Sequence, residues 1–172
     1  LKAELAACAK NRAENLMITD LMRNDLGRIA RPGTVQVPQL FTVESYPSLF
    51  QMTSTVAADI EPDVPLYDVF KSLFPSGSVT GAPKIRAMEI IDELEPERRG
   101  PYAGGCGYIS YDGQMDTCIL IRTMVVKDGA AYLQAGAGVV YDSDPDREYE
   151  ETVNKAMALF KAVDFAEKGL ES

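Results

Sequence analysis

The 172-residue sequence contains no histidine. Histidine is the commonest general base near neutral pH and a frequent zinc ligand, so its absence argues against the usual zinc sites and catalytic triads. Proton transfer by this protein must therefore come from a carboxylate, a lysine, a tyrosine or water.

Cysteine and long apolar runs are also scarce. The three cysteines are odd in number and share no C-x-x-C spacing, which predicts reduced, buried side chains in a cytoplasmic protein. No window approaches the run of about 18 apolar residues that a spanning helix needs. The first residues do not combine a charged segment with an apolar one, so neither a membrane partner nor a secretion signal is expected.

Positive charge is in the minority, with 17 Lys and Arg against 26 Asp and Glu and a net charge of −9. This balance argues against a nucleic-acid groove or an anionic membrane surface as partner. An anionic small molecule would need local positive groups. The hydrophobic content of 46% allows a substantial core, in one domain or in part of a larger one.

Hydrophobic periodicity and turn signals predict an α+β fold. Because Asp112-Gly113 and Asp128-Gly129 are hairpin signals and helical crossovers are few, we expect antiparallel sheets with helices packed outside. Helices are predicted over residues 1–22, 65–74, 84–94 and 145–167, and strands around residues 35–37, 40–44, 49–60, 104–111, 116–126 and 131–135. The core is expected to include Cys106, Cys118 and an inner helix face formed by Ile85, Met88, Ile91 and Leu94.

Residues 75–82 are predicted to form a loop that opens into a helix at Pro83. The segment is not a nucleotide-binding P-loop, because such a loop needs a lysine directly after its second glycine, whereas Gly81 is followed by Ala82 and Pro83. Its amides and the Thr80 hydroxyl could hold a carboxylate, or the loop could be only a turn with a helix cap.

The beginning of the last predicted helix carries a distinctive set of charges. Glu148, Glu151 and Lys155 fall on one face at positions i, i+3 and i+7, after a segment of small residues, 135–138, that can present bare amides. Such groups suit a metal and an anionic substrate, although a solvated helix face is the alternative. In the first helix Asn11 and Glu14 are also spaced i, i+3, so Glu14 could face Glu151 across Mg²⁺, which favours oxygen ligands.

Two further side chains are candidates for anion binding. Alternation along the predicted strand places Arg122 on one face with Cys118, Leu120 and Met124, where a guanidinium needs an anion. That anion is either a substrate carboxylate or an acidic side chain. Tyr102 either joins the core or donates its hydroxyl.

Four segments of the sequence resemble the chorismate-utilising enzymes. They lie in family order and are residues 14–28, residues 80–96, Gly113 with Met115-Asp116-Thr117, and residues 135–138 followed by Glu148-Tyr149-Glu150-Glu151. The resemblance implies that the 172 residues are the C-terminal portion of a single chorismate-binding catalytic domain. The N-terminal portion, with its P-I-(K/A)-G-T motif and a general-acid glutamate, is expected upstream, so little turnover is expected of this chain alone.

The resemblance also implies roles for particular residues. Mg²⁺ would be held by Glu14 and Glu151, with Glu148 nearby as a catalytic group. Arg122 and Tyr102 would bind the enolpyruvyl carboxylate of chorismate, and Lys155, also counted as catalytic, would lie near its ring carboxylate. The remaining contacts to that carboxylate and its surroundings would come from Thr80, Gly136, Ala137 and Gly138.

Within the family, the segments at residues 12–25 and 52–56 are more similar to the members that aminate chorismate at C4 for para-aminobenzoate and folate synthesis, with ammonia from a glutamine amidotransferase subunit. The alternatives are the anthranilate-forming members and a non-catalytic chorismate-binding module. Two departures matter: Asn11 stands where many members have a glutamate, and Gln51 where many have an active-site histidine. Since an amide exchanges no proton at neutral pH, Gln51 favours amination without pyruvate elimination.

Overall fold

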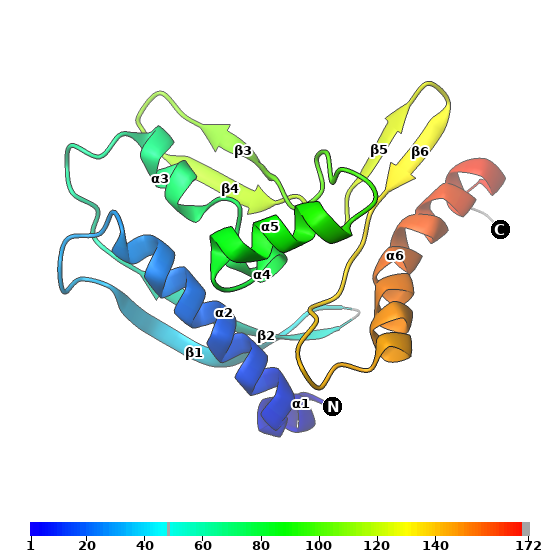
Figure 1. Cartoon of the computed structure of the whole chain (residues 1–172), viewed down its shortest axis with the longest axis horizontal. Helices are drawn as coiled ribbons and strands as arrows, with labels where there is room; N and C mark the ends of the chain where they lie inside the picture. The colour runs from blue at the N-terminus through cyan, green and yellow to red at the C-terminus, as the bar shows by residue number, and fades with distance from the viewer. Residues whose placement is uncertain (48, 170–172) are drawn as a thin grey trace. The chain divides into compact units, whose positions relative to one another are not determined.

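The computed structural model describes residues 1–47 and 49–169, and the chain divides into two compact units, Leu1–Glu93 and Leu94–Ser172. Each unit combines helices with antiparallel strand pairs (Figure 1). The predicted α+β class is thereby confirmed. That the chain is part of one larger domain stays a prediction. None of the helices in the described part of the chain has the length and apolar content needed to cross a bilayer.

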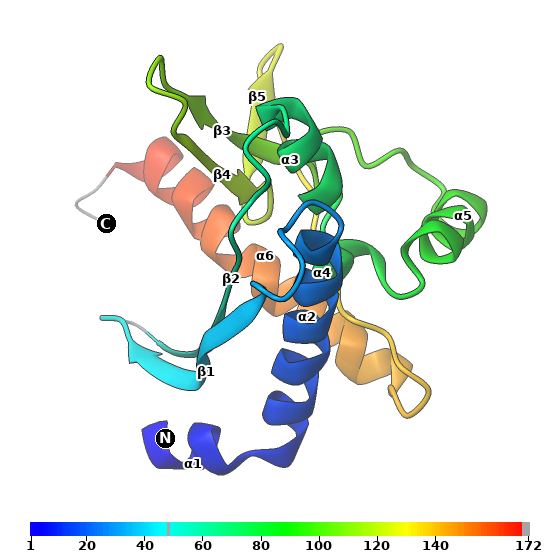
Figure 2. The same ribbon diagram turned by 90° about the vertical axis from the view of Figure 1, so that its left-hand side faces the viewer.

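The first unit opens with two helices, α1 (Lys2–Ala7) and α2 (Ala9–Gly27), in place of the one helix predicted for residues 1–22. The helices are separate because Cys8 has an extended backbone, with φ −67° and ψ 112°, and Figure 2 shows the chain turning sharply there. Helix α2 contacts an antiparallel hairpin formed by β1 (Gln36–Ser45) and β2 (Phe50–Ala57). The Asn15 side-chain amide donates to the Met52 carbonyl oxygen across this contact, at 3.3 Å.

Three more helices complete the first unit: α3 (Leu66–Leu73), α4 (Gly77–Thr80) and α5 (Lys84–Leu94). The bounds of α5 match the prediction, but the loop predicted for residues 75–82 contains the single helical turn α4. The predicted inner face of α5 is wrong in part, since Ile85 and Leu94 are 69% and 73% exposed while Met88 and Ile91 are half-buried. Buried side chains gather instead on α2, α3 and the α4 entry, at Thr19, Asp25, Val69, Ser72 and Ser76.

The second unit contains two hairpins and a long helix. Strands β3 (Gly105–Ile109) and β4 (Met115–Ile119) form one hairpin, β5 (Met124–Lys127) and β6 (Ala130–Leu133) form the other, and α6 spans Pro145–Lys168. Both predicted turns are confirmed, and Asp128 and Gly129 have the positive φ values, 52° and 75°, that two-residue hairpin turns require.

Two predictions for these strands are wrong. The strand expected over residues 116–126 is interrupted between β4 and β5, because Arg122 has a positive φ of 52°, which strands do not accommodate. Cys106 and Cys118 were expected in the core, yet they are exposed and face each other as a cross-strand pair. Cys8 is only half-buried.

Replacing Gly107 with alanine is expected to destabilise the β3–β4 hairpin. A Cβ at this position would collide with the Asp116 carbonyl oxygen and lie 2.7 Å from the Thr117 Cα, so backbone would have to move. We expect a loss of about 2–3 kcal/mol in the free energy of unfolding, the upper part of the range for overpacking, because the collision is with backbone. Urea denaturation checks it, with Gly113→Ala in the hairpin turn as comparison, where φ of 86° gives backbone strain without a collision. Equal stability of Gly107→Ala and the parent would contradict the expectation.

Candidate functional site

The beginning of α6 is fixed by its own sequence. The Asp144 carboxylate accepts a hydrogen bond from the Arg147 backbone N–H at 3.0 Å, and Pro145 occupies the first turn, where its missing N–H costs nothing. The helix therefore starts where the sequence predicts, and Glu148, Glu151 and Lys155 lie on successive turns of one face.

Lys155 connects α6 to the chain segment that follows β6. Its Nζ atom donates to the Gly136 carbonyl oxygen at 3.1 Å and lies 2.5 Å from the Glu151 Oε1 atom. One turn earlier, the Ser143 hydroxyl donates to the Glu148 Oε1 atom at 2.9 Å. The Lys155 side chain is 28% exposed, so the ammonium group is accessible while it is held by two partners.

Tyr102 reaches the same segment from the turn before β3. A Cβ built on Gly136 would lie 2.9 Å from the Tyr102 hydroxyl oxygen, so a glycine is what allows the tyrosine to approach. We call Tyr102, Gly136, Glu151 and Lys155 the Lys155 cluster. The structure thus brings together four of the predicted site residues, one of which, Tyr102, had been left open between core and site.

The backbone after Gly136 is available for binding. Within residues 1–47 and 49–169, the N–H groups of Gly136, Ala137 and Gly138 donate no hydrogen bond, and the three residues belong to no helix or strand. Neighbouring unpaired N–H groups beside a lysine can bind a carboxylate. The predicted amide-bearing segment is therefore compatible with an anion.

Replacing Gly136 with alanine is expected to impair ligand binding more than stability. The added methyl group meets only the end of the Tyr102 side chain, which can rotate away. We expect the free energy of unfolding to change by less than about 1 kcal/mol while ligand affinity falls about tenfold, the effect of one lost hydrogen bond. Ligand titration and urea denaturation of the same variant check this, with Gly138→Ala, where a Cβ meets no atom within 4 Å, as control. A large stability loss with unchanged affinity would contradict it.

The Tyr102 turn is supported by an ion pair between Glu95 and Arg99. The Arg99 Nε and Nη2 atoms donate to the Glu95 carboxylate at 2.5–3.1 Å, and the guanidinium lies 5.6 Å from the Tyr102 ring centroid. The hydrogen bond from Arg99 holds the pKa of Glu95 below its ordinary value, and the same bond raises the pKa of Arg99. This pair orients the backbone from which Tyr102 projects.

Because the pKa of Glu95 is lowered in the folded chain, the pair contributes stability above the ordinary carboxyl pKa, and this contribution is lost as pH falls through the lowered value. Glu95→Gln is expected to cost about 0.5–1 kcal/mol at pH 7, the range for partly exposed pairs. The difference should vanish under acid conditions. Thermal unfolding of parent and variant between pH 7 and pH 3 measures it, and a difference independent of pH would refute this account.

Arg122 lies at the break between β4 and β5, where its side chain is exposed. No described acidic residue forms an ion pair with its guanidinium. Of the two anions considered from the sequence, an acidic side chain is therefore absent from the described part of the chain. Because the side chain is exposed, water can hydrate the guanidinium, and a substrate carboxylate as its partner stays a prediction.

The other predicted site residues lie in the first unit. Glu14 is exposed on α2, while Asn11, one turn earlier, is half-buried. The Thr80 hydroxyl donates to the Ser76 carbonyl oxygen at 3.0 Å, so its single proton is used and its lone pairs are free to accept. Thr80 as seen here can accept a hydrogen bond from a substrate hydroxyl, but would have to rotate to donate to a carboxylate.

A buried ion pair in the first unit was missed from the sequence. The Lys84 Nζ atom lies 2.8 Å from the Asp25 Oδ2 atom, with side chains 17% and 5% exposed. Nothing in a sequence separation of 59 residues marks Asp25 and Lys84 as partners. Asp25 becomes a buried partner of Lys84 because residues of α3 and α5 pack against α2.

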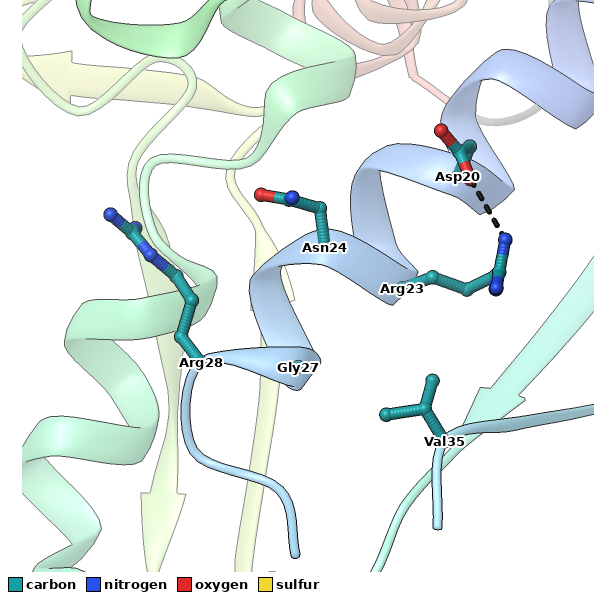
Figure 3. A pocket seen from close by; sticks show the side chains of 6 residues that line it. All are labelled: Asp20, Arg23, Asn24, Gly27, Arg28 and Val35. Carbon is teal, nitrogen blue, oxygen red and sulfur yellow. Dashed lines mark hydrogen bonds and ion pairs between the residues drawn. The ribbon is translucent and has the colours of Figure 1, made fainter. Parts of the chain in front are cut away.

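The depression at the end of α2 is not the candidate site. It has a volume of about 480 Å³ and is lined by Asp20, Arg23, Asn24, Gly27, Arg28 and Val35. Figure 3 shows Arg23 turned to Asp20, which it binds at 2.9 Å, while Asn24 and Arg28 extend to the other side. The guanidinium groups do not converge on one point, and none of the predicted site residues lines the depression.

Comparisons with known proteins identify related chains. The family model described as chorismate binding enzyme matches residues 1–161. The chain is 51% identical over 166 residues to anthranilate synthase component 1 of Acetivibrio thermocellus, covering 96% of this chain and 34% of the relative. It is 53% identical over 152 residues to aminodeoxychorismate synthase component 1 of Salmonella typhimurium, covering 88% of this chain and 34% of the relative. The chain thus spans about a third of the length of these curated relatives.

Two solved structures share the fold. Anthranilate synthase component I from Streptococcus pneumoniae TIGR4 superposes with a TM-score of 0.84 at 49% identity, over 90% of this chain and 35% of that one. A putative 2,3-dihydroxybenzoate-specific isochorismate synthase from Bacillus anthracis gives a TM-score of 0.83 at 26% identity, over 95% of this chain and 43% of that one. The antiparallel α+β architecture is therefore that of known proteins.

Proposed function

We propose, from the premise that the chain belongs to the family of chorismate-binding enzymes, that it carries the substrate-anchoring part of an enzyme that aminates chorismate at C4. The product would be 4-amino-4-deoxychorismate, the precursor of para-aminobenzoate, and a separate glutamine amidotransferase subunit would supply the ammonia. The observation that carries the proposal is the Lys155 cluster beside three unpaired backbone amides.

Chorismate is a dianion with a ring carboxylate, an enolpyruvyl carboxylate and a hydroxyl at C4. The amides of Gly136–Gly138 and the Lys155 ammonium suit one carboxylate, because both donate hydrogen bonds to anions. Arg122 and the Tyr102 hydroxyl suit the other, since the described part of the chain leaves the guanidinium without an acidic partner. The lone pairs of Thr80 suit a substrate hydroxyl.

Glu148 is the candidate for proton transfer. Its carboxylate is half-buried and held by Ser143, so one oxygen is oriented and the other is free to exchange a proton with ammonia or the leaving hydroxyl. The Lys155 ammonium group neutralises the charge of the Glu151 carboxylate and keeps that side chain in place. These residues bind, orient and move protons without a histidine.

Magnesium is part of the proposal, with Glu14 and Glu151 as its ligands. The donor chemistry fits, because carboxylate oxygens are what Mg²⁺ prefers, and Lys155 occupies only the Oε1 atom of Glu151. When bound, the ion would offset negative charge at the ring carboxylate. Within residues 1–47 and 49–169, no three acidic or cysteine side chains gather closely enough to hold a metal by themselves, so water and substrate would complete the coordination.

The choice between amination and anthranilate formation rests on Gln51. The curated relatives include members with either name at 50–53% identity, so similarity alone does not decide. Gln51 lies on β2, opposite Glu44. An amide at this position can donate a hydrogen bond but cannot shuttle a proton, which favours the reaction that retains the enolpyruvyl group.

The test is product analysis with the complete protein. It is incubated with chorismate, Mg²⁺ and ammonium salt, half of the sample receives aminodeoxychorismate lyase, and products are separated by chromatography. Para-aminobenzoate appearing only with the lyase is the expected result. Anthranilate and pyruvate in both halves would replace the proposal by anthranilate synthesis, and bound but unchanged chorismate would leave a binding module.

A further inference from the structure

Helix α2 contacts the segment that carries Thr80 at two points one turn apart. A Cβ on Gly77 would lie 2.9 Å from the Leu21 Cδ1 atom, so the first residue of α4 sits directly on the Leu21 side chain. Four residues along α2, on the same face, Asp25 binds Lys84, the first residue of α5. The segment from Gly77 to Lys84 is therefore held by α2 at both ends. Helix α4 lies beside α2 in Figures 1 and 2.

The two ends are held by different kinds of contact. At the first end the buried Ser76 accepts hydrogen bonds from the Thr80 hydroxyl and the Val79 backbone N–H, at 3.0 and 3.1 Å, so α4 is tied to Ser76. At the second end the Lys84 side chain crosses to α2 and binds Asp25. Gly81, with φ of 134°, separates Thr80 from that anchor and has no side chain to pack.

Asp25 is itself fixed from a second side. The Ser72 hydroxyl of α3 donates to the Asp25 backbone carbonyl oxygen at 2.5 Å, and both residues are buried. This hydrogen bond fixes the Asp25 backbone against α3, so the position of the carboxylate is set by α2 and α3 and not by the loop. The ion pair therefore transmits the position of α2 to the end of the Thr80 segment.

We propose that the Asp25–Lys84 ion pair is a positioning device for the substrate contact of Thr80. The inference rests on the proposed function, which assigns that contact to Thr80. Asp25 and Lys84 act through Thr80 and need not touch the substrate. Loss of the pair leaves the Lys84 end of the Gly77–Lys84 segment without its tether to α2, so Thr80, the last residue of α4, samples positions in which its oxygen no longer meets the substrate hydroxyl.

The experiment uses steady-state kinetics of chorismate consumption by the complete protein. The variant is Asp25→Asn with Lys84→Met, which removes the tether without leaving an unpaired buried charge. We expect KM for chorismate to rise about tenfold and kcat to change less, since the loss of one hydrogen bond to bound substrate is of that size. Arg86→Met is the matched control, because Arg86 binds Glu89 at the same 2.8 Å on the same helix, with both side chains more than half exposed.

The Thr80→Val variant tests whether the Asp25–Lys84 ion pair acts by positioning Thr80 or only by stabilising the fold. If the ion pair acts through Thr80, Thr80→Val raises KM by a similar factor, and adding Asp25→Asn and Lys84→Met to it raises KM no further. An unchanged KM in the Asp25→Asn, Lys84→Met protein, or effects that multiply in the triple variant, would overturn the inference. The proposed function would still stand if the parent forms 4-amino-4-deoxychorismate. A parent that neither binds nor converts chorismate would overturn both.

Discussion

Replacing Glu151 with glutamine is expected to lower kcat/KM for chorismate by at least about 100-fold, more than is typical for a residue that only supports a metal ligand. The change keeps the shape of the side chain and removes its charge. Lys155, whose Nζ atom lies 2.5 Å from the Glu151 Oε1 atom, then loses its anionic partner. The oxygen proposed for Mg²⁺ becomes a weak neutral ligand at the same time.

Titration with Mg²⁺ separates the loss of the proposed metal ligand from the loss of the anionic partner of Lys155. If Glu151 binds the ion, the concentration for half-maximal activity rises in Glu151→Gln, and excess Mg²⁺ recovers part of the loss. Glu150→Gln is the control, because Glu150 is the exposed neighbour on α6 and its carboxylate forms no ion pair with the described residues. Parental activity in Glu151→Gln would remove Glu151 from the site. A loss that Mg²⁺ does not alter would leave it only as the partner of Lys155.

Local signals in the sequence predicted those elements whose ends are fixed by their own residues. Helix α6 begins at Pro145 because Asp144 caps it, and the β5–β6 hairpin forms at Asp128-Gly129 because both residues adopt positive φ. The spacing of Glu148, Glu151 and Lys155 likewise needs nothing beyond helix geometry. These features depend on neighbours within a few positions, which is the range that a single sequence reveals.

Features decided by more distant contacts were predicted poorly. Alternation of apolar residues does not reveal that Arg122 adopts a positive φ, which divides the expected strand in two, or that Cys8 is extended between two helices. The approach of Tyr102 to Gly136 joins residues 34 positions apart, and Asp25 meets Lys84 across 59. Such contacts follow from how elements pack. The residues alone leave Tyr102 open between the core and a hydroxyl donor, and the family resemblance implies the site.

The second large effect is expected on stability, when the buried ion pair between Asp25 and Lys84 is broken. Lys84→Met is expected to lower the free energy of unfolding by about 3 kcal/mol, the lower end of the range for breaking a buried pair, since Lys84 keeps some contact with solvent. The Asp25 carboxylate, 5% exposed and fixed through Ser72, would then be a buried charge without a partner. Urea denaturation of the complete protein measures the loss, with Arg86→Met expected to change it by less than about 1 kcal/mol.

The two partners should differ in what their removal costs. In Asp25→Asn the lysine keeps a flexible stem, and from a side chain already 17% exposed it can turn its ammonium group to water, so we expect about half the loss of Lys84→Met. In the double variant no charge is left unpaired, and its stability should exceed that of Lys84→Met. Equal losses in all three proteins would mean that packing of the stems, and not the buried carboxylate, sets the cost. The kinetic role of the pair would then have to be tested with the more stable Asp25→Asn protein, in which the carboxamide still reaches Lys84 but no longer fixes it by charge.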